Sequence, residues 1–262
     1  MISIVIPAYN EEKRIGKILG TYGSFFSDKK KKKEIKNFEL LIVINNTKDK
    51  TEEVVKEFSK KYPEIRYLNF KLGGKGFAIT EGFKDALKRN NEFIGFVDAD
   101  MSTPPEAFYY LIKTIERNKR IGGVIANRWD KRSIISPKQS LFRRFISRGY
   151  NLIVRAFFLF PYPDTQCGAK IFRREILEKN INKMISSQWN FDVALLFCLK
   201  KEANAKIIDI PTTWEDKQVS KINLKRTPVL MFVSLIRLRL LHSPFNFLVR
   251  AYRKLPAKLK IH

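Results

Sequence analysis

Two aspartates, separated by one residue, directly follow an apolar run in this 262-residue chain. Asp98 and Asp100 come after the residues FIGFV, which predict a buried strand. A turn there can aim both carboxylates at one point, where a divalent cation relieves their mutual repulsion. Hard carboxylate oxygens suit Mg²⁺ or Mn²⁺, and these ions also bind substrate phosphates. Acidic pairs in loops are more often merely solvated, so it is the position at a strand end that favours a metal site.

Other common catalytic groups are scarce. The two histidines, His242 and His262, both stand late in the sequence, so a histidine-based triad is nearly excluded. The two cysteines, Cys167 and Cys198, form no CxxC motif and indicate neither a disulfide framework nor a zinc site.

The elements that would position these groups alternate through the first half of the chain. We predict strands at residues 2–7, 38–45, 65–70, 93–98 and 122–127, and helices at residues 12–24, 50–61, 76–89 and 105–118. Continuous apolar strands joined by helices are typical of βαβ units, so the expected class is α/β, with a mostly parallel sheet flanked by helices. Ligands of such sheets bind beyond the carboxyl ends of the strands, which here are residues 9–11, 45–47 and 98–100. The lysine-rich run at residues 28–33 is most simply a solvated loop.

The formal net charge of +25 implies an anionic partner, such as nucleic acid, a phosphorylated substrate or acidic lipid headgroups. A lysine-rich proteome would explain part of it. No stretch reaches the roughly 18–20 apolar residues that cross a bilayer, and residues 229–241 are interrupted by Arg237 and Arg239. The first residues indicate a strand and no signal peptide. We therefore expect a cytoplasmic protein, peripheral on the inner face of the membrane, without a transmembrane helix.

Two stretches combine arginine with aromatic and aliphatic residues. The first covers residues 142–158, and the second begins at Arg226, where LIRLRLL precedes FNFLVRAYRKL. Such stretches are typical of interfacial helices, whose apolar side enters the headgroup layer while arginines meet lipid phosphates. We predict C-terminal amphipathic helices, with a globular domain over residues 1–225 and a basic amphipathic membrane-surface tail over residues 226–262. The alternative is that these stretches pack on the domain or form a dimer contact.

Five segments resemble, in order along the chain, the motifs of family 2 glycosyltransferases with the Rossmann-like GT-A fold. They are SIVIPAYNEEKRIGKIL, GGKGFAITEGF, FVDADMSTPPEAF, DTQCGAKIFRREIL and WNFDVALL. Within the family the chain is most similar to dolichyl-phosphate glucosyltransferases and polyprenyl-phosphate hexose synthases. The resemblance implies a GT-A domain over residues 1–225. It also implies inverting transfer of a hexose from a nucleotide sugar, with UDP-hexose favoured, to a polyprenyl phosphate at the cytoplasmic membrane face.

The resemblance also implies roles for residues at matching positions. Asp98 and Asp100 would hold Mg²⁺ or Mn²⁺, and Arg128 and Asp192 would act with them in catalysis. The residues implied to bind the nucleotide sugar are Pro7, Tyr9, Glu11, Asn45, Lys75, Asp98, Ala99, Asp164, Gln166 and Trp189. Each has a plainer interpretation: Pro7 can end a strand, Tyr9 and Trp189 can pack, and the glycines around Lys75 can merely open a helix.

Two positions depart from the family pattern. Asn45-Asn46-Thr47 stands where relatives usually have two aspartates followed by Gly-Ser, and Ala194 stands where they often have glutamate. An asparagine carbonyl can accept from a base N–H without charge, so contact with the base can survive. The choice between UDP and GDP stays open, as do the sugar, the lipid length and the oligomeric state.

The acceptor determines the mechanism. A sugar hydroxyl needs a general base, whereas a lipid monophosphate, with a second pKa of about 6, is already a dianion near neutrality. Catalysis then consists of positioning, neutralisation of the leaving group by metal, and capture of the acceptor by arginine, whose forked donors suit phosphate. The expected acceptor-phosphate residues are Arg128, Arg144, Arg148 and Lys221, the last in a polar loop after Trp214.

Two other functions compete with this interpretation. A family 2 enzyme acting on a glycan or another hydroxyl acceptor would share the early motifs, but it would need a general base and would have less use for basic-aromatic helices. A nucleic-acid-binding module would explain the charge alone. No such motif occurs, and carboxylates at the strand ends would repel phosphate unless a metal is bound, so we expect no nucleic-acid partner.

Overall fold

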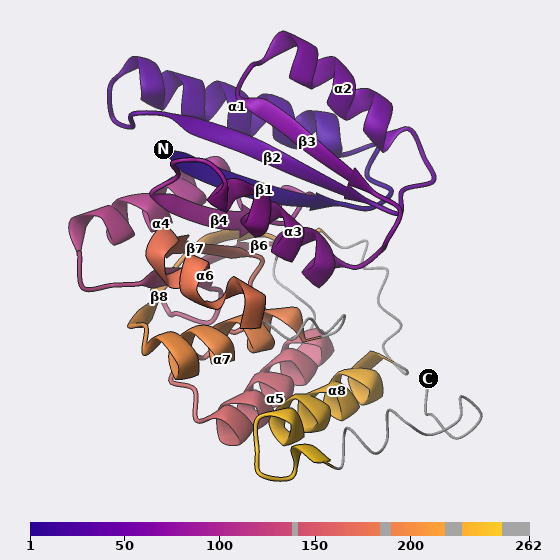
Figure 1. Ribbon diagram of the computed structural model, residues 1–262, viewed down its shortest axis with the longest axis vertical. Helices are drawn as coiled ribbons and strands as arrows, with labels where there is room; N and C mark the ends of the chain where they lie inside the picture. Colours follow the sequence, from indigo (N-terminus) through magenta and orange to yellow (C-terminus); the bar gives the residue numbers. More distant parts are fainter. Residues whose placement is uncertain (138–140, 184–189, 218–226, 248–262) are drawn as a thin grey trace.

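The computed structural model describes residues 1–137, 141–183, 190–217 and 227–247 (Figure 1). Seven strands form a central sheet in the order β3-β2-β1-β4-β7-β5-β8. Neighbouring strands are parallel, apart from β7, which runs antiparallel to both β4 and β5. The strands are β1 (Ile2–Ala8), β2 (Phe38–Asn45), β3 (Ile65–Phe70), β4 (Phe93–Val97), β5 (Gly123–Asn127), β7 (Ala169–Arg173) and β8 (Ile207–Pro211). Two short strands, β6 (Ile134–Ser136) and β9 (Thr213–Glu215), pair in a separate sheet.

Helices cover both faces of the large sheet and enclose two hydrophobic cores. One core lies under α1, α2 and α4, and the other under α3 and the helices α5 to α8. The helices are α1 (Ile15–Lys31), α2 (Thr51–Lys61), α3 (Lys75–Leu87), α4 (Pro105–Arg117), α5 (Leu141–Phe158), α6 (Arg174–Asn180), α7 (Phe191–Ala203) and α8 (Thr227–Leu241), with a 3₁₀ turn at Ile181–Lys183. The predicted α/β class and mostly parallel sheet are confirmed.

The apolar runs form the sheet because both of its faces are covered. Every residue of β2 is buried, as expected of a central parallel strand. Helix α3 lies close against β1 and β2 at Gly82, where an added Cβ would come 2.4 Å from Val5 Cγ1. This contact fixes the height of α3 above the sheet, and with it the place of the helix's first residue, Lys75.

The elements predicted for the first half of the chain lie within a few residues of their predicted bounds, with one difference. Helix α1 continues to Lys31, so most of the lysine run expected as a loop is helical. Lysines in a last helical turn interact favourably with the helix dipole. Lys29 and Lys32 also form ion pairs with Glu34 and Asp28, at 3.1 and 2.9 Å.

Helix α8 packs on the domain. Its Leu235 and Leu238 are buried in the second core, while Arg237 and Arg239 between and after them are exposed. Phe232 of α8 also contacts Phe157 of α5, with ring centroids 6.1 Å apart. The predicted start of the tail, at residue 226, lies outside the described residues. In Figure 1, α5 and α8 lie side by side at the end of the molecule farthest from α1 and α2.

Candidate functional site

The ends of β1 and β2 are joined by an asparagine. The Asn45 side chain donates to the Ala8 carbonyl oxygen at 3.0 Å, and its own carbonyl oxygen accepts from the Gly74 N–H at 3.0 Å. An aspartate could not make both bonds, because a carboxylate cannot donate. This buried amide therefore connects β1, β2 and the loop that precedes Lys75. Its predicted contact with the nucleotide base stays a prediction.

The other predicted nucleoside residues border this junction. Pro7 is part-buried in β1, and Tyr9 is exposed just beyond the strand. Glu11 forms a two-pronged ion pair with Arg14, with N–O distances of 2.6 and 2.7 Å. The structure thus brings Tyr9 and Asn45 to the same edge of the sheet, with the Tyr9 ring open to solvent.

Asp98 leaves the end of β4 and fits between two neighbours. On one side an added Cβ at Gly168 would lie only 1.9 Å from Asp98 Oδ2, so no larger residue fits there. On the other side Lys75 Nζ lies 2.6 Å from Asp98 Oδ1. Burial raises the pKa of the Asp98 carboxyl; Lys75 opposes this shift, and the nearby charges of Asp100 and Asp192 add to it.

Asp100 is held by its own turn. Its Oδ1 accepts from the Ser102 N–H at 2.9 Å, and the intervening Met101 has a positive φ of 61°. Ala99 between the aspartates is buried. The two predicted metal ligands therefore come off one tight turn.

A second ion pair, Lys170 with Asp192, lies beside the first and is buried. Lys170 is fully buried in β7, and its ammonium lies 2.5 Å from Asp192 Oδ1 and 2.6 Å from the Cys167 carbonyl oxygen. Both lysines approach one aromatic ring: Lys170 Nζ lies 5.2 Å and Lys75 Nζ 5.7 Å from the Phe96 ring centre. The first turns of α3 and α7 can come this close because Gly76 has no side chain: an added Cβ there would lie 2.8 Å from Phe191 Cβ.

Sequence reasoning gave Lys170 no role. The signal was a lysine inside the apolar strand AKIFR, since lysine is almost never fully buried without a partner. The partner, Asp192, stands 22 residues later in the chain, at the start of another helix. Only the fold brings the two together.

Arg128 and Asp164 form a third ion pair, in which Asp164 is fully buried. Arg128 Nε and one terminal nitrogen contact the two carboxylate oxygens of Asp164 at 2.7 and 2.9 Å, and the Arg128 backbone N–H donates to the same group at 3.0 Å. Burial alone would raise the pKa of Asp164, but Arg128 lowers it below its usual value. Arg128 is thus fixed in place by Asp164.

Several N–H donors around this pair lack a partner among the described residues. They are the indole N–H groups of Trp129 and Trp214 and the side-chain amide N–H of Gln166. The Arg128 guanidinium lies 4.9 Å from the Trp214 ring and 5.6 Å from the Trp129 ring, and Arg148 approaches Trp129 at 5.3 Å. Buried donors without partners cost free energy. The surroundings of the Arg128–Asp164 pair therefore suit an oxygen-rich, anionic ligand.

The remaining predicted residues are placed as follows. Arg144 lies on α5, one helical turn before Arg148. Trp189 and Lys221 lie outside the described residues. Gln166 donates through its backbone to Asp164 at 3.2 Å.

The donor set fits a divalent metal that also contacts a substrate. Within the residues that the structure describes, no cluster of three or more His, Cys, Asp or Glu could hold an ion alone. Asp98 and Asp100 supply two carboxylates. Mg²⁺ is usually held by one or two carboxylates together with water and substrate phosphates, so this pair fits such an ion.

The face formed by α5 and α8 is basic and partly apolar. The sequences of the two helices contain no acidic residue and six arginines, which are Arg143, Arg144, Arg148, Arg155, Arg237 and Arg239. Phe145, Leu152 and Leu159, spaced seven residues apart, are 78%, 65% and 80% exposed. Across the described ranges no helix is both long and apolar enough to cross a membrane.

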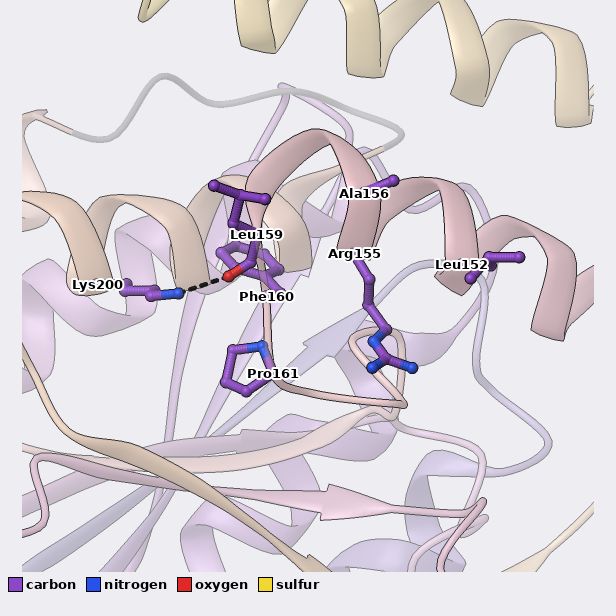
Figure 2. Close-up of a pocket in the computed structure, with 7 residues that line it drawn as sticks. All are labelled: Leu152, Arg155, Ala156, Leu159, Phe160, Pro161 and Lys200. Atoms are coloured by element: carbon purple, nitrogen blue, oxygen red, sulfur yellow. Dashed lines mark hydrogen bonds between the residues drawn. The ribbon is translucent and has the colours of Figure 1, made fainter.

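A groove with a volume of about 510 Å³ lies at the C-terminal end of α5, lined by that helix, the turn that follows it and Lys200 of α7. Figure 2 shows Arg155 and Lys200 on either side of the turn at residues 159–161. Lys200 Nζ donates to the Leu159 carbonyl oxygen at 2.7 Å, which holds the ammonium at the groove's rim.

Comparison with known proteins agrees with this fold. A dolichyl-phosphate beta-glucosyltransferase of Trichomonas vaginalis is 31% identical over 256 residues, covering 96% of this chain and 77% of the relative. The dolichyl-phosphate beta-glucosyltransferase of Dictyostelium discoideum is 29% identical, covering 91% and 73%. Glucosyl-3-phosphoglycerate synthase from Mycobacterium tuberculosis, solved with Mn²⁺, uridine diphosphate and phosphoglyceric acid, has the same GT-A fold. It superposes with a TM-score of 0.66 at 15% identity, covering 92% of this chain and 77% of that one.

Residues 3–181 match the model of glycosyl transferase family 2. That match covers nearly all of β1, the Lys75 loop, the two aspartates after β4 and the Lys170 strand, while Asp192 and Trp214 lie beyond it. The resemblance seen in the sequence is confirmed: the chain is a glycosyltransferase and belongs to family 2.

Proposed function

We propose that this enzyme transfers a hexose, with inversion, from a UDP-sugar to a polyprenyl phosphate at an anionic membrane surface, with a divalent cation bound at Asp98 and Asp100. The observation that carries the proposal is the pairing of the site's carboxylates. Asp98, Asp164 and Asp192 each contact a lysine or arginine. A hydroxyl acceptor needs a free general base, whereas a phosphate acceptor arrives already ionised.

The donor half of the site follows from Asp98, Asp100 and Lys75. A divalent cation at the two aspartates would neutralise the charge that develops on the leaving nucleoside diphosphate. Lys75, at the first turn of α3, stands beside that position. The solved synthases with the same fold that bind uridine diphosphate with Mn²⁺ support this arrangement.

The acceptor half follows from Arg128 and its surroundings. Arg128 is fixed by Asp164, and Arg128 and Arg148 both approach the Trp129 ring. The indole N–H groups of Trp129 and Trp214 have no partner within the described part of the chain. A phosphate monoester dianion would satisfy these donors. The relatives named as dolichyl-phosphate beta-glucosyltransferases support an acceptor of this class. We place the lipid chain toward the α5–α8 face.

The test is a matrix of donors and acceptors. UDP-glucose, UDP-N-acetylglucosamine and GDP-mannose are each incubated with a polyprenyl phosphate and with the corresponding polyprenol, and the glycolipid product is measured with Mg²⁺, with Mn²⁺ and with excess chelator. We expect product from a UDP-sugar and the phosphate only, and its loss on chelation. Equal product from the alcohol would show that a general base operates and that the acceptor is a hydroxyl.

A further inference from the structure

The carboxylate of Asp98 is accessible to a cation from one side. Its Oδ2 abuts Gly168, whose backbone carbonyl oxygen also accepts from the Asp98 N–H at 3.1 Å. Its Oδ1 contacts the ammonium of Lys75 at 2.6 Å. A metal ion that binds Asp98 therefore approaches the oxygen that Lys75 already contacts, and two cations cannot share that position without strong repulsion.

Lys75 can leave that oxygen without disturbing the fold. Its side chain is 38% exposed, and it stands at the first residue of α3, where the helix is held by the close packing of Gly76 and Gly82. The preceding Gly74, with a φ of 123°, is anchored to Asn45. The backbone is thus fixed by other residues, while the long lysine side chain is free to reorient.

We infer that Lys75 is an exchangeable counter-ion: a divalent cation displaces its ammonium from Asp98, and the ammonium moves to the donor's diphosphate. The inference rests on the proposed function for the identity of the two ligands, a divalent cation and a nucleoside diphosphate. It adds that Lys75 couples their binding. Metal alone binds weakly because it must displace Lys75, and nucleotide favours metal because its phosphates take over the released ammonium.

Loss of the Lys75 charge should change the Mn²⁺ affinity in the direction opposite to that expected for a lysine that merely helps to hold the metal site together. Replacement of Lys75 by methionine removes the competing charge, so Mn²⁺ should bind more tightly when no nucleotide is present. UDP should bind more weakly because its phosphates lose a cation. Coupling between two ligands is reciprocal, so the mutual enhancement of Mn²⁺ and UDP should fall by the same factor in both directions.

The experiment measures Mn²⁺ binding by electron paramagnetic resonance, with and without UDP, and UDP binding by calorimetry, with and without Mn²⁺. The variants are Lys75→Met, Lys75→Gln and the charge-preserving Lys75→Arg. We expect the two neutral variants to bind Mn²⁺ alone roughly tenfold more tightly than wild type, within the range typical of coupled sites, and Lys75→Arg to resemble wild type. Lys84→Met is the matched control, since Lys84 lies on the same helix in an exposed pair with Glu81.

Unchanged or weaker Mn²⁺ binding in both neutral variants overturns the inference, as does absence of Mn²⁺ binding to wild type with UDP present. These equilibrium measurements require no acceptor. If Mn²⁺ and UDP binding are coupled through Lys75 but no product forms with polyprenyl phosphate, only the proposed acceptor is refuted.

Discussion

At the scale of single residues, the position of Asp98 depends on a glycine. Gly168 has no Cβ, and this allows the Asp98 carboxylate to lie against the backbone after Asp164 and Gln166. Gly168→Ala should therefore push Asp98 away from its position. We expect a loss of more than about 100-fold in kcat/KM, because misplacement by about 1 Å can cost that much. Steady-state kinetics with a saturating metal concentration measures it.

The control for this change is Gly23→Ala in α1. An added Cβ at Gly23 meets nothing within 4 Å. This variant should keep full activity and gain about 0.5–1 kcal/mol of stability, because alanine is a better helix residue than glycine. Wild-type kinetics in Gly168→Ala would show that Asp98 is not needed at its observed position.

Arg128 and Arg148 were both predicted to contact the acceptor phosphate, and the structure separates them. Arg128 neutralises the fully buried Asp164, whereas Arg148 is exposed. Arg128→Met should reduce the free energy of unfolding by about 3–5 kcal/mol, because it leaves a buried charge unpaired. Arg148→Met should change it by less than about 1 kcal/mol and should instead raise KM for the polyprenyl phosphate. Urea unfolding and acceptor titrations measure the two effects.

The stability difference made by Arg128→Met should also depend on pH. The pKa of Asp164 is lowered in the folded protein from its ordinary value of 3.8. The pair's contribution is therefore complete above that ordinary value and is lost as the pH falls through the lower, folded-state pKa. A difference between the two proteins that stays constant down to pH 2 would contradict this account.

Residue types and spacing predicted the aspartate pair, and the family resemblance added Lys75 and Asp192, but neither predicted the ion pairs that these residues form. Asp98 and Asp100 could be identified because a strand end places adjacent carboxylates together. Lys170 could not be assigned, because its partner comes from a distant helix. The dual role of Asn45 was also hidden, since the carbonyl that accepts from it ends β1 and the N–H that donates to it lies in the loop before α3.

At the scale of elements, one asparagine joins three helices. The Tyr150 hydroxyl of α5 donates to the Asn190 side-chain oxygen at 2.5 Å, and the Asn190 amide donates to the Met231 carbonyl oxygen of α8 at 2.8 Å. Asn190 is fully buried and immediately precedes α7, whose first turn carries Asp192. The two helices of the basic face are thus connected to a carboxylate of the site.

Asn190→Ala should therefore affect use of the acceptor more than binding of the donor. We expect a several-fold higher KM for polyprenyl phosphate and a lower kcat, with the affinity for UDP unchanged. Tyr150→Phe should show a smaller change in the same direction. The control is Asn180→Ala, which removes another buried asparagine, whose amide donates within its own helix to the Ile176 carbonyl oxygen. A uniform loss of stability without a change in KM would reduce Asn190 to a packing role.

The elements that the sequence predicted are those with a strong local pattern. The parallel strands β1 to β5 and the helices between them alternate regularly. Strands β6 and β9 were missed because they have only three residues, and β7 and β8 because they carry polar groups such as Lys170 and Asp209. The antiparallel insertion of β7 between β4 and β5 depends on contacts between residues far apart in the sequence, so no local pattern predicts it.

At the scale of the whole molecule, exposed apolar side chains and arginines occur together on α5. Phe145 and Leu152 lie along one face of α5, because seven residues make nearly two helical turns, and the exposed Leu159 directly follows the helix. Arg148 and Arg155 have the same spacing, three residues after the first two, and form a neighbouring row. An apolar row beside an arginine row is the pattern of a helix lying at a membrane surface.

We therefore expect the protein to co-sediment with anionic vesicles through this face. Basic residues near such a surface each contribute about 1 kcal/mol, screened by salt over about 8–10 Å, so binding should weaken as salt rises. The apolar row should supply a remainder that salt does not remove. Phe145→Ser with Leu152→Ser and Leu159→Ser should abolish that remainder while leaving the charge, and hence the low-salt binding, in place.

Two further sets of variants decide where the contact lies. Serine at Tyr62, Tyr110 and Ile134 removes an equal number of exposed apolar side chains from other elements and should leave vesicle binding unchanged. Serine at Phe245 and Phe247 tests the segment after α8, which the sequence analysis assigned to a membrane-surface tail. One outcome is that the triple serine variant at Phe145, Leu152 and Leu159 binds vesicles at high salt as well as wild type does, while the variant at Phe245 and Phe247 does not. In that case the tail makes the contact, and the apolar row of α5 faces another protein. If only the α5 variant loses the salt-resistant binding, the folded domain itself contacts the bilayer, and Arg128 and Arg148 then lie on the side from which a lipid-linked phosphate would arrive.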